Sequence, residues 1–139
     1  MRTLFLTILA ATAVMLGGCA STAGGDITEA TWHLTSITSI HRQAIVPVED
    51  MVNYTLTFND DGTFDAKADC NQVGGTYTIV DASVLTMTLG PSTLAVCGEE
   101  SLGDDYVQLL DDVKTYSIAE NQMTLTLEDS SELLYQSAT

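Results

Sequence analysis

Basic residues are scarce in this 139-residue chain. It holds four lysines and arginines against 19 aspartates and glutamates, which gives a formal net charge of −15 at neutral pH. A surface of this sign repels the phosphate backbone of nucleic acids and offers no polybasic patch to anionic lipids. We therefore expect no nucleic-acid partner. The acidity itself fits either adaptation to a salty medium, where charges are screened, or attraction of cations and basic partners.

Catalytic motifs are also missing. The only histidines are His33 and His41, and their spacing does not suggest metal chelation. No serine stands in a G-x-S-x-G setting, which hydrolases of one large class require. We therefore expect no enzyme activity, no cofactor and no metal. A deep cleft that gathered one histidine with a buried carboxylate would revive a catalytic interpretation.

Long hydrophobic runs are absent except at the start of the chain. Arg2 precedes an apolar stretch at residues 4–16, which is shorter than the roughly 20 residues that a membrane-spanning helix needs. A basic residue followed by a short apolar stretch is typical of a secretory signal peptide. Leu16-Gly17-Gly18-Cys19 resembles a bacterial lipobox, in which the cysteine thiol receives a diacylglycerol group.

Three segments follow from this interpretation. Residues 1–18 are a lipoprotein signal peptide, residues 19–26 are the lipidated Cys19 with a short tether, and residues 27–139 are one domain. The residue after the lipidated cysteine is Ala20 and not an aspartate. By resemblance to the sorting rule of Gram-negative lipoproteins, this favours release to the outer membrane. We expect an outer-membrane lipoprotein of the cell envelope that faces the periplasm. An ordinary signal peptide that is cut elsewhere, for instance after residues 20–23, is the alternative.

Two cysteines remain beside Cys19. In an exported domain, an isolated pair such as Cys70 and Cys97 predicts a disulfide. The bridge would close a loop of about 28 residues and stabilise the domain by roughly 3 to 4 kcal/mol. The alternative, a metal pair or a reactive thiol, lacks the nearby cysteine or histidine ligands that such sites use.

Alternating apolar and polar residues, with threonine at many second positions, indicate strands with one solvated face. We expect strands at residues 31–37, 54–58, 63–69, 76–80, 84–89, 123–127 and 133–135. Asn59-Asp60-Asp61-Gly62 predicts a hairpin turn, since aspartate followed by glycine is a strong turn signal. The same residues could suggest a calcium-binding loop of the EF-hand type, but Ala68 stands where that loop needs glutamate. Pro47 makes residues 40–52 a loop or an irregular edge segment.

One segment has the period of a helix. Between residues 101 and 114, apolar side chains recur at three- and four-residue intervals and form one stripe: Leu102, Tyr106, Leu109, Leu110 and Val113. Aspartates near the start and a lysine at the end suit the helix dipole. Gly103 weakens the start of the helix. We expect this helix to pack its stripe against the sheet.

Residues 69–77 predict a tight, specific turn. Cys70 and Asn71 are followed by Gly74, Gly75 and a strand that begins with an aromatic residue. Glycine permits positive φ or a close backbone approach, and an asparagine side chain can bond the backbone of a turn. Asn71, Gly74 and Gly75 are therefore interpreted as structural turn residues.

The order of these motifs resembles the META domain (HslJ-like) family over residues 27–136. The motifs are the first strand with Trp32, a strand ending in phenylalanine before Gly62, Cys70-Asn71 with Gly75-Thr76-Tyr77, residues 93–97, the helix and the closing strands. Asp69 departs from the glycine common before the cysteine, and Leu94 or Ala95 stands where a basic residue is frequent. The resemblance implies an α+β, mostly β fold: a curved antiparallel sheet of about seven or eight strands packed against one helix.

The same resemblance implies a non-enzymatic, lipid-anchored envelope protein that supports envelope integrity or stress and antibiotic tolerance. One alternative is a pilot- or chaperone-like module that binds an apolar ligand or a protein partner, lined by Tyr54, Phe64, Tyr77 and Tyr116. Another is an enzyme inhibitor that uses a loop at Gly90-Pro91. The expected partners are the membrane, through the N-terminal lipid, and an envelope protein. We expect a monomer.

Overall fold

The computed structural model describes residues 26–41 and 43–138. The predicted signal peptide (residues 1–18), the lipidation site Cys19 and residues 19–25 of the tether lie outside the described residues. Within the described ranges, no helix is long and apolar enough to cross a membrane.

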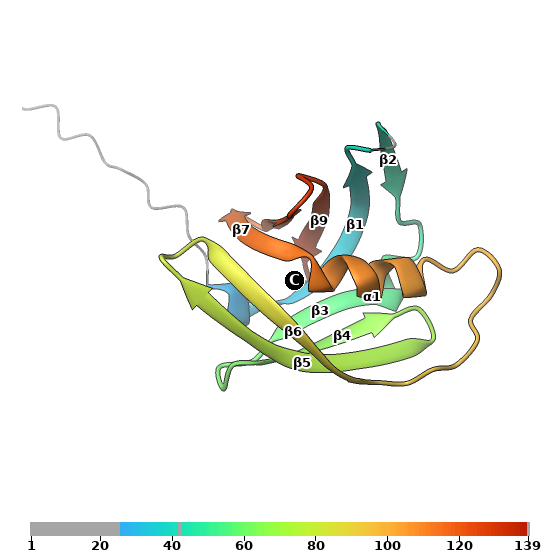
Figure 1. Ribbon diagram of the computed structural model, residues 1–139, viewed down its shortest axis with the longest axis horizontal. Coiled ribbons are helices and arrows are strands. Elements are labelled where there is room, and N and C mark those ends of the chain that lie inside the picture. The colour runs from blue at the N-terminus through green and yellow to red at the C-terminus, as the bar shows by residue number, and fades with distance from the viewer. Residues whose placement is uncertain (1–25, 42, 139) are drawn as a thin grey trace, which may run out of the picture.

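The described residues contain nine strands, and the alternating pattern correctly located seven of them; Figure 1 shows how the strands are arranged. In strand β3, for example, the buried side chains of Tyr54, Leu56 and Phe58 alternate with two half-buried threonines. The strands are β1 (Thr31–Ser39), β2 (Ala44–Pro47), β3 (Tyr54–Phe58), β4 (Thr63–Ala68), β5 (Asn71–Val80), β6 (Val84–Ser92), β7 (Val113–Ala119), β8 (Gln122–Leu127) and β9 (Glu132–Ser137).

The sheet closes on itself. All neighbouring strands are antiparallel, in the order β2-β1-β3-β4-β5-β6-β7-β8-β9, and β1 also pairs with β9 from Trp32↔Ser137 to Thr38↔Glu132. Eight strands thus form a barrel, and β2 continues beside β1 beyond the end of β3. The mostly β, antiparallel fold with one helix is confirmed. Closure goes beyond the predicted curvature, and the β1–β9 pairing covers the edge of β9 that an open sheet would expose.

The strand predictions missed β2 and β7. Strand β2 lies in the segment predicted to be a loop or an irregular edge, and it is indeed an edge strand of four residues. Strand β7 begins at Val113, which the helical stripe had included. Residue Lys114 therefore belongs to a strand, where its ammonium group lies 3.3 Å from the Glu128 carboxylate, and not to a helix end.

The helix is shorter than predicted. Helix α1 spans Gly103–Asp111 and buries Tyr106 and Leu110. It lies across the space between the β1–β2 hairpin and strands β4 to β6 (Figure 1). Gly103 is required there, because a Cβ at this position would lie 2.8 Å from the carbonyl oxygen of Ala68 in β4. Because Gly103 has no side chain, the first turn of the helix can approach the barrel wall closely.

Side chains fill the barrel. An eight-stranded barrel is just wide enough for its own side chains, and the largest fully buried ones include Tyr106, Tyr135, Phe58 and Phe64. Tyr54 is also buried, and Tyr77 and Tyr116 pack against the same core. The four aromatic residues proposed to line a ligand groove are therefore part of the core or packed on it.

Candidate functional site

The Cys70–Cys97 disulfide predicted from the sequence is present, with 5.7 Å between the two Cα atoms. Cys70 lies in the short turn between β4 and β5, and Cys97 lies in the irregular segment between β6 and α1. The bridge therefore ties this connecting segment to the barrel wall.

Asn71 holds the same segment from within. Its side chain is buried, and its Nδ2 atom donates a hydrogen bond to the carbonyl oxygen of Ala95 at 2.9 Å. Its Oδ1 atom accepts from the Ala95 amide at 2.7 Å and from the Thr93 hydroxyl at 3.0 Å. A buried amide needs such partners, because an unpaired polar group costs free energy. The sequence motif Cys70-Asn71 thus acts as a clamp on residues 93–97.

The predicted turn is wrong in its position. Asn71, Gly74 and Gly75 lie within strand β5, and the chain turns earlier, at Asp69, whose φ is 59°. The pairing of β5 with β6 shifts register between Val73 and Gly75. A Cβ at Gly75 would collide with the Thr88 carbonyl oxygen and lie 2.5 Å from the Phe64 ring. The glycine signal therefore reflected a close approach of strand and ring, not a positive φ.

The clamped segment presents two large apolar side chains to solvent. Leu94 is 92% exposed and Val96 is 100% exposed, on either side of the clamped Ala95. Gly90 and Pro91, where an inhibitory loop was considered, instead lie in strand β6.

The histidines lie in different places. The Nδ1 atom of His33 is 3.2 Å from the carbonyl oxygen of Met51. The Nε2 atom of His41 is 3.3 Å from Oδ2 of Asp129, and both side chains are open to solvent. Neither histidine therefore meets a buried carboxylate in a cleft.

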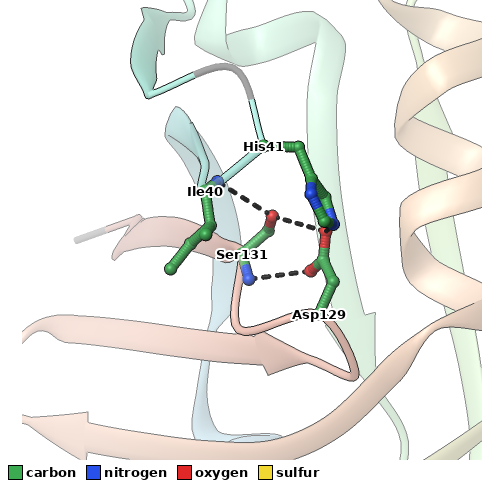
Figure 2. A network of polar contacts seen from close by, with 4 residues as sticks. All are labelled: Ile40, His41, Asp129 and Ser131. Carbon is green, nitrogen blue, oxygen red and sulfur yellow. Dashed lines mark hydrogen bonds and ion pairs between the residues drawn. The ribbon is translucent and has the colours of Figure 1, made fainter.

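Ser131 completes a polar network with Asp129 and His41, shown in Figure 2. Its hydroxyl donates to Oδ2 of Asp129 at 2.9 Å and accepts from the Ile40 amide at 3.3 Å. In a serine-histidine-aspartate triad the histidine stands between serine and aspartate and accepts the serine proton. Here the aspartate stands in the middle, so this network joins two loops and does not prepare a nucleophile.

Hydrogen bonds stabilise the ionised form of the Asp129 carboxyl. The backbone amide of Ser131 donates to it at 2.8 Å, and this bond, the Ser131 hydroxyl and the charge of His41 lower the pKa of the Asp129 carboxyl below its usual value. The network ties the tip of the β1–β2 hairpin to the turn between β8 and β9.

A groove runs between the β1–β2 hairpin and α1, beside this network. Its apolar surface comes from buried Ile37 and half-buried Val46, which are paired across β1 and β2, and from half-buried Leu102 and Leu109 of the helix side. Its polar lining contains three exposed aspartates together with a glutamine and two serines: Asp105, Asp112, Asp129, Gln108, Ser39 and Ser131. The groove has a volume of about 250 Å³.

Another hollow, of about 590 Å³, lies on the outer face of strands β3 to β6. It is lined mainly by small or polar residues such as Thr55, Thr57 and Gly74, with Val73 and Pro91 as its larger apolar side chains. Across residues 26–41 and 43–138, no three metal-binding side chains gather at one place. Of these two hollows, the groove beside α1 has the larger set of aliphatic side chains, next to three aspartates.

Among models of protein families, that of the META domain matches residues 25–139. A solved structure of a protein from Burkholderia xenovorans is similar, with a TM-score of 0.67 and 22% identity over 81% of this chain and 84% of that one. A DUF4847 family protein from Bacteroides vulgatus superimposes with a TM-score of 0.58 and 14% identity over 79% and 93% of the two chains. At these identities the structures share the fold alone. No curated protein matches the chain in sequence.

Proposed function

The chain belongs to the META domain family over residues 25–139, and on that premise we propose that it is a non-enzymatic, lipid-anchored protein of the cell envelope. Its role is to support envelope integrity under stress, including exposure to antibiotics. It is attached to the outer membrane through Cys19, faces the periplasm and works as a monomer.

The observation that carries this proposal is the doubly held segment at residues 93–97. A disulfide from Cys70 and four hydrogen bonds of the Asn71 side chain, including one to Cys97 Sγ, secure it. Disulfides persist in oxidising compartments such as the bacterial periplasm, so the Cys70–Cys97 bridge supports export. The lipobox-like sequence before Cys19 then supplies an anchor that an acidic protein cannot obtain from basic residues.

The polar network of His41, Asp129 and Ser131, in which the aspartate lies between the other two side chains, supports a role without catalysis. The Ser131 hydroxyl donates a hydrogen bond to Asp129 and accepts one from the Ile40 amide, so its hydrogen-bonding capacity is used in joining two loops. The packed barrel also leaves its largest aromatic side chains no contact with solvent. The protein therefore acts through its outer surface.

Intact-mass spectrometry of protein purified from membranes tests the anchor and the compartment. We expect a mass that includes acyl chains on Cys19 and a gain of about 2 Da when the disulfide is reduced. A Cys19→Ala variant should lose the acyl mass and leave the membrane fraction. An unlipidated wild-type mass would contradict the anchor, and free Cys70 and Cys97 thiols would contradict residence in an oxidising compartment.

The cellular role needs a separate experiment. Deletion of the gene should increase sensitivity to detergent, heat and drugs, and wild-type protein should restore tolerance. Cys19→Ala should not restore it, because an unanchored domain loses its position at the membrane. Unchanged sensitivity of the deletion strain across these stresses would overturn the proposed role.

A binding module is the second candidate, and the groove beside α1 favours it. Small-molecule pockets usually enclose about 300 to 1,000 Å³, whereas this groove has about 250 Å³. Its size suits a few side chains of a protein partner better than a whole ligand. On this candidate, the domain is a pilot- or chaperone-like protein that holds a segment of another envelope protein.

A further inference from the structure

We propose that the groove between the β1–β2 hairpin and α1 binds a basic, amphipathic helical segment of a partner protein. The inference rests on the binding-module candidate and adds the chemistry of the partner. Apolar side chains of the segment enter the floor of the groove, and its lysines or arginines meet the aspartates around it.

The floor is built for aliphatic side chains. Ile37 and Val46 form one wall, directly paired across β1 and β2, and Leu102 and Leu109 face them from the helix side. Val46, Leu102 and Leu109 are only partly covered within the described protein. Covering this aliphatic surface removes it from water, which is the main favourable contribution to association.

The charges around the floor select a basic partner. Asp105 and Asp112 of the helix side and Asp129 of the β8–β9 turn line the groove, and its lining contains no lysine or arginine within the described part of the chain. Lys114, near the end of the helix, is 3.3 Å from Glu128 instead. Oppositely charged groups across an interface guide the partner and set its register.

The spacing of two aspartates suggests the form of the segment. Asp105 lies in α1 and Asp112 directly follows its last residue, so the two are seven residues apart, about 10 Å along the helix axis and nearly on the same side of it. Two basic residues one heptad apart on a partner helix have the same separation. Leucines three or four residues from each would then face the floor, as in other helix-in-groove complexes.

The groove is already formed before a partner arrives. The Ile40 amide donates to Ser131, and Asp129 accepts from Ser131 and pairs with His41, so the hairpin tip is tied to the β8–β9 turn (Figure 2). The helix side is held where the Leu102 amide donates to the Tyr54 hydroxyl at 2.9 Å. A preformed site avoids the entropic cost of ordering its walls during binding.

A synthetic peptide tests the proposal with the full-length protein in detergent solution. The probe is a fluorescent amphipathic helix with lysines one heptad apart and leucines between them. A second peptide has the same composition in scrambled order, so that lysines and leucines do not segregate. Fluorescence anisotropy should show at least about tenfold tighter binding of the ordered peptide, since only it can fill the floor and reach the rim together.

Matched variants locate the site. Asp105→Asn with Asp112→Asn should weaken binding about tenfold, since both carboxylates meet the peptide. Asp104→Asn with Asp111→Asn removes the same charge from the same helix, one residue earlier at each position, where neither side chain lines the groove. This control should bind within about twofold of wild type. Leu109→Gln, which alters the floor, should also weaken binding.

Two outcomes would overturn the proposal. Equal weakening by both aspartate pairs would show attraction to a diffuse acidic surface, and equal affinity for the ordered and scrambled peptides would remove the amphipathic requirement. Circular dichroism spectra of the variants establish that each one is folded. Failure here, with stress sensitivity still present in the deletion strain, would reject the groove and leave the proposed envelope role intact.

Discussion

The hydroxyl of Tyr135 donates a hydrogen bond to the hydroxyl of Tyr106 at 3.2 Å, inside the barrel. Tyr135 comes from the last strand and Tyr106 from the helix, and both side chains are fully buried. Because a buried hydroxyl without a partner is costly, this bond joins α1 to the barrel wall in one position.

The two hydroxyls should therefore be coupled in their effect on stability. Replacing both tyrosines should lower the free energy of unfolding by less than the sum of the two single replacements. Tyr135→Phe leaves the Tyr106 hydroxyl buried without its partner and should lower the free energy of unfolding by about 1 to 3 kcal/mol. The double variant with Tyr106→Phe should be more stable than the sum of the single changes implies, by about 1 kcal/mol. Urea unfolding of the four proteins measures this coupling, and simple additivity would show that the hydroxyls do not interact.

The same pair predicts alkaline unfolding. Burial raises the pKa of both Tyr106 and Tyr135 in the folded protein, whereas tyrosine in an unfolded chain titrates near about pH 10. The contribution of the two protonated tyrosines to the free energy of unfolding is fully present below that pH. It is lost as the pH rises toward their pKa values in the folded protein. Phenolate absorbance and circular dichroism should thus change together, and Tyr106→Phe/Tyr135→Phe should unfold at higher pH. Ionisation of all five tyrosines in a natively folded chain would contradict this.

Asn71→Ala should release the clamped segment. It removes four hydrogen bonds and leaves the Ala95 backbone groups without these partners, so we expect a loss of about 2 to 4 kcal/mol in the free energy of unfolding. Residues 93–97 should also become more sensitive to proteases. Gln72→Ala is the matched control, since its exposed side chain lies outside the clamp, and equal effects of the two variants would argue against a clamp.

The disulfide and Asn71 should act on the same segment. Cys70→Ser with Cys97→Ser should lower the free energy of unfolding by about 3 kcal/mol, because the unfolded chain gains freedom. Because both features secure residues 93–97, adding Asn71→Ala should cost less in this background than in wild type. Thermal and urea unfolding of the combined variants provide the test, and strictly additive losses would separate the two features.

Adjacent glycines should differ sharply in tolerance. A Cβ at Gly75 would strike the Thr88 carbonyl oxygen and the Phe64 ring, whereas a Cβ at Gly74 would lie 3.6 Å from the Phe64 carbonyl oxygen, an ordinary contact. Gly75→Ala should therefore destabilise by about 3 kcal/mol or more, and Gly74→Ala by less than about 1 kcal/mol. Similar melting temperatures for the two variants would contradict the close packing of β5 against Phe64.

Local patterns in the sequence predicted local structure well. The period of two located seven strands, the Asp61-Gly62 sequence located the β3–β4 turn, and the helical stripe located α1. Each of these signals depends on neighbouring residues, because side-chain direction repeats along a strand or helix. The cysteine pair was predictable because only two cysteines remained in the domain.

Contacts between distant segments were harder to predict. In a sequence, a glycine can indicate either a turn or a close approach of two segments. At Gly75, the nearby Phe64 ring and Thr88 carbonyl oxygen show that it is a close approach. Gly103 appeared unfavourable for a helix until Ala68, from another element, was placed beside it. The groove brings together β1, β2, α1 and the β8–β9 turn, and no local period reports such a meeting.

The pairing of β1 with β9 makes closure of the barrel depend on its last strand. Strand β1 meets β9 from Trp32↔Ser137 to Thr38↔Glu132, and the Ala138 amide donates to the Thr31 carbonyl oxygen. During synthesis β1 is made early but has no partner on this side until β9 has been made. A chain that stops before residue 132 would lack β9 and leave two strand edges unpaired, which favours aggregation. Barrel closure thus requires both the first and the last strand of the domain.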